Sequence, residues 1–158
     1  SLWSNKVIRV LNFKSILSKF GQDIGIGPVS LDDRESCYLR FNQHTLVIEH
    51  IKNQELLYIY TAISEPKDVK REDYLEHLLT ANHFGQGTGN AAFSFNPNTQ
   101  ETFLSTKISD KALEYDSFVL ALEQFLFSID KAYEFLAELH KEKTAPLHPD
   151  MHLKNPFA

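Results

Sequence analysis

Three β-rich runs in the first half of the chain lie so close together that they limit the folds open to it. The runs cover residues 37–41, 45–51 and 55–63, and only three residues separate each run from the next. Parallel pairing would need a crossover connection of about a dozen residues, for which neither break has room. The runs therefore predict an antiparallel meander.

Further helices and strands are expected on either side of this meander. The expected helices cover residues 5–20, a short segment that ends near residue 82, and 116–139, and a later hairpin covers 91–95 and 102–107. Apolar residues recur every three or four positions in the helical segments, as they do in amphipathic helices. The order α-β-β-β-α-β-β-α predicts a single α+β domain at residues 5–143, with a twisted antiparallel sheet flanked by helices.

Single residues predict where the helices begin and end. Asn5 is the expected N-cap of the first helix, Gly21 is its expected stop, and Asp68 is a candidate cap for the second helix. Residues 144–158 contain several prolines and two histidines and have no periodicity. They are expected to form a flexible C-terminal tail.

Length, charge and cysteine content exclude several classes of protein. A chain of 158 residues buries roughly 70% of its unfolded surface, so one hydrophobic core needs no disulfide or metal. The net charge is −5 and no Lys/Arg-rich block is present, so nucleic acid is not an expected partner. The lone Cys37, the lack of a signal peptide and the lack of an apolar run near the ~20 residues that span a bilayer indicate a cytosolic protein without membrane insertion.

The glycine-rich stretch GQGTG, with Gly85, Gly87 and Gly89, could be mistaken for a phosphate-binding loop. Such a loop follows a strand and precedes a helix, so that the helix N-terminus faces the phosphate. Here a predicted helix precedes the glycines and a strand follows, and the C-terminal end of a helix dipole repels anions. The glycines instead predict a left-handed C-cap at Gly85 and close backbone approach at the other two.

Residues that could bind a metal or act as a nucleophile are present but form no recognised pattern. His148 and His152 are four apart, but Pro149 between them opposes a helix that would align them. No Cys or carboxylate cluster completes a tetrahedral set of ligands. The sequence also lacks a GxSxG motif. We therefore expect no catalytic residues, no metal and no cofactor.

The remaining titratable residues of the meander region have structural interpretations. Cys37 opens an alternating strand and is expected to be a small packed thiol, although the sequence leaves a Cys–His pair open. His44 and His50 are expected in a turn and on an outer strand face. The acidic residues of the loop at 32–35 are expected to be solvated.

A longer block of sequence carries a family resemblance. The segment LLTANHFGQGTGNAAFSFNPNTQETFLSTKI, followed by the helix start YDSF, resembles the core signature of the Tir-chaperone (CesT) family, the class I chaperones of bacterial type III secretion. The positions that match are Leu78, Leu79, Ala81, Asn82, Gly89, Ala92, Leu104 and Phe118. The His83-Phe84 pair and the C-terminal tail depart from the pattern.

The resemblance implies a function and a set of contact residues. It implies a homodimeric, ATP-independent chaperone of the bacterial cytoplasm that binds the N-terminal segment of secreted effectors in extended form. The effector would stay soluble and be presented to the secretion ATPase. By family position, the dimer interface is expected to include Tyr74, Leu75, Leu78 and Phe93. The effector-binding grooves are expected to be lined by Ile8, Leu11, Leu17, Leu39, Phe41, Leu46 and Ile48.

The residues themselves leave other functions open. The apolar stripe of the first helix is equally consistent with plain core packing. The same fold could serve as a peptide-binding or structural adaptor without a role in secretion. A small hydrolase with a site assembled from scattered His and acidic residues is a third class, disfavoured because no motif supports it.

Overall fold

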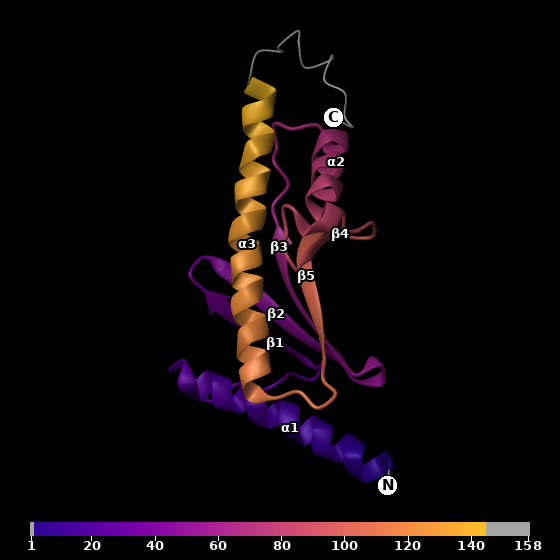
Figure 1. Cartoon of the computed structure of the whole chain (residues 1–158), viewed down its shortest axis with the longest axis vertical. Helices are drawn as coiled ribbons and strands as arrows, with labels where there is room; N and C mark the ends of the chain where they lie inside the picture. The colour runs from indigo at the N-terminus through magenta and orange to yellow at the C-terminus, as the bar shows by residue number, and fades with distance from the viewer. Residues whose placement is uncertain (1, 145–158) are drawn as a thin grey trace.

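The computed structural model describes residues 2–144, with the side chains of residues 13–139. The described chain forms three α-helices and one five-stranded sheet, with short 3-10 turns after β2 and after α2 (Figure 1). The elements are α1 (Leu2–Asp23), β1 (Ser36–Phe41), β2 (His44–Ile51), β3 (Leu56–Ile63), α2 (Arg71–Asn82), β4 (Ala92–Asn96), β5 (Glu101–Ser109) and α3 (Tyr115–Thr144). The predicted α+β architecture and order of elements are confirmed.

The sheet is antiparallel throughout and has the strand order β1-β2-β3-β5-β4. The first three strands form the predicted meander, with Leu39 opposite Leu46 and Ile48 opposite Ile59. β5 inserts between β3 and β4, so that Thr61 lies opposite Leu104. β1 and β4 are therefore the two edge strands.

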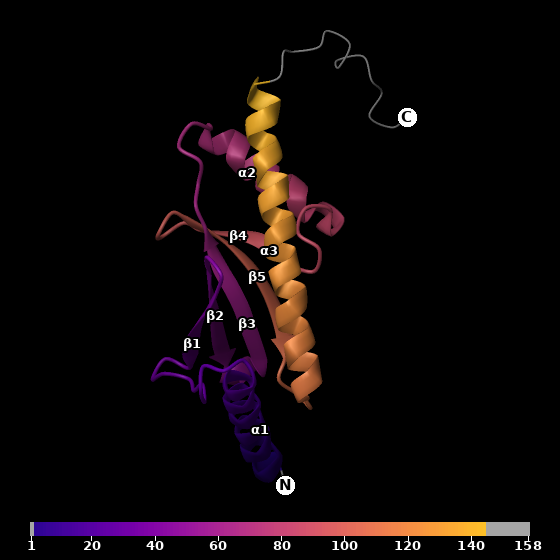
Figure 2. The same cartoon turned by 90° about the vertical axis from the view of Figure 1, so that its left-hand side faces the viewer.

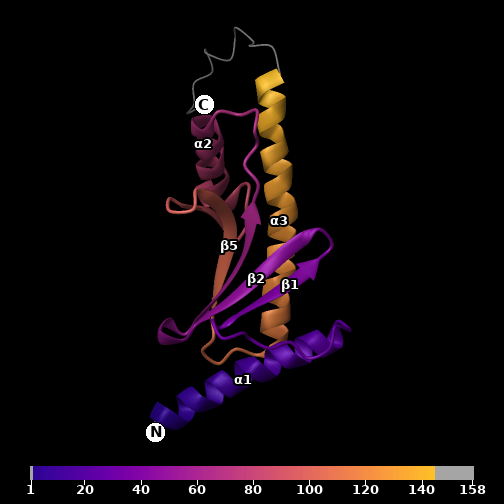
Figure 3. The same ribbon diagram turned by 180° about the vertical axis from the view of Figure 1, so that it is seen from behind.

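The hydrophobic core lies between one face of the sheet and the helices α1 and α3. Alternate strand residues, among them Leu46, Ile48 and Leu57, are fully buried on this face, as the period of two in a strand requires. Phe118 of α3 packs edge-on against Phe20 of α1, with ring centroids 5.6 Å apart. α3 runs along the sheet and α1 crosses its lower end, whereas no helix of residues 2–144 covers the other face (Figures 2 and 3).

The boundaries of α1 differ from those predicted. The helix begins at Leu2, so Asn5 is not its N-cap, and it continues through Gly21 to Asp23. A Cβ atom on Gly21 would lie 2.2 Å from the carbonyl oxygen of Gly27. The glycine therefore allows the following loop to approach the helix and does not end it.

The starts and ends of α2 and α3 also differ from the prediction. The N-cap of α2 is Lys70, without a side-chain capping bond, so Asp68 is not the cap. α3 continues beyond Leu139 to Thr144. The remainder of the predicted tail, from residue 145, lies outside the described residues. None of the helices in the described part of the chain is long and apolar enough to cross a membrane.

The glycines after α2 form a turn, as predicted, but Gly85 is not the C-cap of this helix, which is His83 in an extended conformation. Gly85 adopts a left-handed φ of 67°, and its carbonyl accepts a bond from the amide of Gly89 at 2.8 Å. A Cβ atom on Gly87 would lie 2.7 Å from the Cβ of Ala81 and 2.8 Å from the ring of Phe135. The turn thus reverses the chain in close contact with α2 and α3.

Candidate functional site

An apolar groove lies between α2 and the edge strand β4. Its volume is about 210 Å³, and it is lined by Leu75, Leu78, Leu79, Asn82, Phe93, Ser94 and Phe95. Leu79 is 70% exposed at its rim. A leucine that exposed beside an apolar groove is typical of a protein contact surface.

Asn82 fixes the groove by joining α2 to the outer edge of β4. Its side-chain amide donates to the carbonyl of Phe93 at 3.1 Å, and its side-chain oxygen accepts from the Phe93 amide at 2.7 Å. The outward-facing backbone groups of β4 at Phe93 are therefore already paired. An added strand cannot use this part of the β4 edge.

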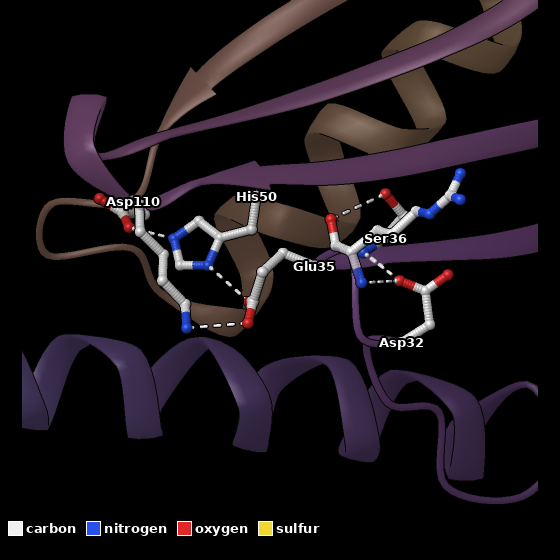
Figure 4. Close-up of polar contacts among 7 residues, drawn as sticks. Asp32, Glu35, Ser36, His50 and Asp110 are labelled. Atoms are coloured by element: carbon white, nitrogen blue, oxygen red, sulfur yellow. Dashed lines mark hydrogen bonds and ion pairs between the residues drawn. The ribbon is translucent and has the colours of Figure 1, made fainter.

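Among the described residues, the outward-pointing backbone groups of the opposite edge strand, β1, are paired only at its start. The Asp32 amide donates to the Ser36 carbonyl at 2.8 Å. The Ser36 amide donates to Asp32 Oδ1 at 3.0 Å (Figure 4). Backbone groups along an antiparallel strand point alternately toward and away from the partner strand. The N–H and C=O groups of Tyr38 and Arg40 therefore also point away from β2, where an extended peptide can pair with them.

Three of the four residues expected at a dimer interface line the groove beside α2. They are Leu75, which is half-buried, and Leu78 and Phe93, which are buried. Tyr74 lies beneath them in the core, where its hydroxyl is 2.7 Å from Thr102 Oγ1. Burial raises the pKa of this phenol above its ordinary value.

The residues expected to bind effectors have a different distribution. Phe41 is half-buried at the end of β1 and packs near Phe20 of α1, with ring centroids 6.4 Å apart. Ile8 and Leu11 belong to the part of α1 whose side chains lie outside the described ones. The others are buried in the core of this chain: Leu17, Leu39, Leu46 and Ile48.

The uncovered face of the sheet carries a hollow that the sequence analysis did not identify. Its volume is about 440 Å³, and it is lined by Glu49, Ile51, Tyr58, Tyr60, Ser94, Phe95, Asn96, Phe103 and Ser105. The alternation in β3 was a usable signal, because it places Tyr58 and Tyr60 on the face opposite Leu57 and Ile59. Large aromatic side chains on an uncovered face favour a binding surface.

The prediction for His50 is wrong, because this residue is buried on the core side of β2. Its Nε2 lies 2.7 Å from Asp110 Oδ2 and its Nδ1 lies 3.8 Å from Glu35 Oε2 (Figure 4). Lys52 Nζ lies 2.8 Å from the other oxygen of Glu35. The Phe13 ring of α1 packs against the imidazole, with ring centroids 5.2 Å apart.

This His50 cluster, formed by Glu35, His50, Lys52 and Asp110, joins segments that are distant in sequence. It connects the loop before β1, the end of β2 and the turn between β5 and α3. The imidazole is 1% exposed, so it cannot reach a substrate proton as a general base must. The cluster is therefore a structural link beneath α1.

Cys37 is a buried thiol, as predicted. Burial raises the pKa of the thiol to about 11, so it remains protonated at neutral pH and is a poor nucleophile. Within the described residues, no group of three His, Cys, Asp or Glu side chains is arranged to hold a metal ion. His148 and His152 lie outside these residues.

Comparison with known proteins supports a single family. A model of the Tir chaperone protein (CesT) family matches residues 15–132. No curated protein sequence matches the chain.

Solved structures share the fold at low sequence identity. A chain in the crystal structure of the ExsC–ExsE complex is 19% identical, with a TM-score of 0.60, and the match covers 72% of this chain and 85% of that one. A chain in the HopA1–SchA chaperone–effector complex is 15% identical, with a TM-score of 0.59 and coverages of 90% and 98%. The Yersinia pestis type III secretion chaperone SycH, in complex with a stable fragment of YscM2, provides a match that is 14% identical, with a TM-score of 0.56 and coverages of 78% and 98%. At these identities the likeness shows a common fold.

Proposed function

The chain belongs to the Tir chaperone protein (CesT) family, and from this premise we propose that it binds the N-terminal segments of secreted effectors in extended form. The protein is thus a chaperone and not an enzyme. The observation that carries the proposal is the family match over residues 15–132. A structural relative solved as a chaperone–effector complex supports it.

We propose that the client segment adds to the β1 edge of the sheet. Main-chain bonds at Tyr38 and Arg40 would supply affinity that does not depend on client sequence, and apolar side chains seated nearby would supply selectivity. Phe41, at the end of β1, belongs to the predicted effector-binding set and is half-buried. Contacts to Leu17 of α1 or to Leu39, Leu46 and Ile48 of the sheet would require α1 to move from the sheet, since all four side chains are buried in the core between them.

A second copy of the chain is the proposed occupant of the groove between α2 and β4. A twofold dimer places the same patch of both subunits in contact. Leu75, Leu78 and Phe93, together with the exposed Leu79, would then be covered by the partner. Such a dimer would hold two client-binding edges and so offer an extended client a larger contact area.

The chaperone would keep its client soluble and ready for export in the bacterial cytoplasm and present it to the secretion ATPase. Holding a segment extended costs conformational entropy, which a large contact surface offsets. This role needs no nucleotide hydrolysis and no cofactor by the chaperone itself.

Client capture followed by truncation tests this function. The tagged chain is used as bait in lysate of the native bacterium, bound proteins are identified by mass spectrometry, and each is co-expressed with the chaperone with and without its N-terminal segment. We expect a large secreted protein that is soluble only in the presence of the chaperone and is no longer bound after truncation. Binding that survives the truncation would contradict the proposal and favour a peptide-binding or structural adaptor.

A further inference from the structure

The hollow on the uncovered sheet face contains a single charged group among aromatic walls. Of the nine residues that line it, only Glu49 carries a formal charge. Tyr60 and Phe103 stand perpendicular to each other, with ring centroids 5.8 Å apart and an interplanar angle of 87°. Tyr58 lies directly opposite Glu49 in the register of β2 and β3.

A neighbouring phenol holds the Glu49 carboxylate in place. The Tyr60 hydroxyl donates to Glu49 Oε2 at 3.1 Å. Partial burial, with the charge of Glu49, raises the pKa of Tyr60 to about 12, so the phenol remains a donor at neutral pH. A carboxylate has about four acceptor sites, and one phenol leaves most of them to a ligand.

These features select a flat cation. A guanidinium group stacks on aromatic rings and pairs with a carboxylate through two parallel N–H donors, whereas an ammonium group is more strongly hydrated and lacks the flat face. The chain uses the same kind of contact beside the hollow, where the Arg71 guanidinium lies 4.9 Å from the centre of the Phe95 ring. Lys107 lies opposite Tyr58 on β5, so Tyr58 stands between Lys107 and Glu49 in the sheet.

We propose that this hollow binds an arginine side chain presented by an extended client segment, with the guanidinium paired to Glu49 and stacked against the aromatic rings of Tyr58, Tyr60 and Phe103. The proposal rests on the proposed function for the source of the ligand. It adds a chemical preference: clients should carry an arginine flanked by small or apolar residues that can lie along the sheet.

A peptide titration tests the site on the purified, full chain. The probe is a short capped peptide in which threonine and valine alternate around a central arginine, and its partner has citrulline in place of arginine, which keeps the shape and removes the charge. Binding is followed by NMR of the backbone amides. We expect the arginine peptide to bind at least about tenfold more tightly than the citrulline peptide, since a charge-assisted bond and cation–π stacking are lost together, and to shift resonances of Tyr58, Tyr60 and Phe103.

Three variants test whether the preference for the arginine peptide arises in this hollow. Glu49→Gln retains the shape of the side chain and should remove the difference between the two peptides, and Tyr60→Phe should reduce it. Glu123→Gln, an equal change of charge at an exposed position on α3, should leave the difference intact.

Equal binding of the two peptides, an arginine preference that survives in Glu49→Gln, shifts confined to another surface, or no binding of either peptide would each overturn the proposal. Failure of the client capture with an intact arginine preference would count against the chaperone function alone.

Discussion

The two faces of the sheet are built from the same strands, yet they have different compositions and different neighbours. The face under α1 and α3 presents aliphatic residues such as Leu46, Ile48 and Leu57, all fully buried. The opposite face presents Tyr58 and Tyr60 around a hollow that also contains a carboxylate. The covered face therefore maintains the fold. The uncovered face carries amphipathic side chains, which can contact either water or a binding partner.

Truncation on each face tests this difference most strongly. Leu46→Ala creates a cavity in the core and should lower the free energy of unfolding by about 4 kcal/mol. The neighbouring Val47→Ala, on the half-buried outer side of the same strand, should cost less than about 1 kcal/mol. Urea unfolding measures both, and similar losses for the two variants would contradict the assigned faces.

Removal of the His50 side chain should have the next largest effect. His50→Ala leaves the Asp110 carboxylate, 5% exposed, without its imidazole partner, and we expect a loss of about 3 kcal/mol. Adding Asp110→Asn to His50→Ala should restore part of this loss, because the buried charge is gone. If the single variant is as stable as the wild type in urea unfolding, the cluster does not hold these segments together.

A charge placed in the α2 groove should separate the proposed dimer. Leu75→Glu should weaken self-association at least ~100-fold, because a carboxylate would be buried without a partner at the interface. Leu120→Glu makes the same change at an exposed leucine on α3 and should leave the dimer intact. Light scattering with analytical ultracentrifugation measures the mass, and a Leu75→Glu dimer of unchanged affinity would remove the groove from the interface.

A proline on the β1 edge should weaken client binding by about tenfold, which corresponds to about 1.4 kcal/mol. Tyr38→Pro removes an outward-pointing N–H, a change that an edge strand tolerates. Tyr38→Thr retains the N–H and removes the aromatic ring. We expect the proline variant to bind the client's N-terminal segment more weakly than the threonine variant in calorimetry, and equal affinities would argue against strand addition.

The smallest expected effect is a pH dependence from the uncovered face. Because the folded-state pKa of Tyr60 is raised from 10.0 to about 12, its contribution to stability is fully present below pH 10 and is lost as the pH rises toward 12. The melting temperature of the wild type should therefore fall more over this range than that of Tyr60→Phe. Parallel curves for the two proteins would show that burial and Glu49 do not perturb this phenol.

Much of the fold could be predicted because local spacing determines it. Breaks of three residues leave only antiparallel pairing for the first three strands, and a helix before the glycines indicates a turn and not a phosphate-binding loop. The helix boundaries were less predictable. Gly21 allows the Gly27 carbonyl to approach α1 closely. This contact exists only once the loop has folded back, so the general preference of glycine for helix ends predicted the wrong end of α1.

The candidate sites depend on contacts that a one-dimensional pattern does not contain. Alternation places His50 with Leu46 and Ile48, so its burial could have been predicted, but its partner Asp110 is 60 residues away. The hollow likewise needs Phe103 beside Tyr60, which follows from β5 pairing with β3. Alternation shows which residues share a face, and only the packed helices show which face they cover.

Hydrogen exchange of the chain, alone and bound to the N-terminal segment of a captured client, tests the central claim most directly. If the client adds to β1, the amides of Tyr38 and Arg40 should exchange more slowly in the complex, since their N–H groups then have acceptors. The Phe93 amide, already bonded to Asn82, should be protected in both states. Unchanged exchange at Tyr38 and Arg40 in a saturated complex would contradict client binding by strand addition at this edge.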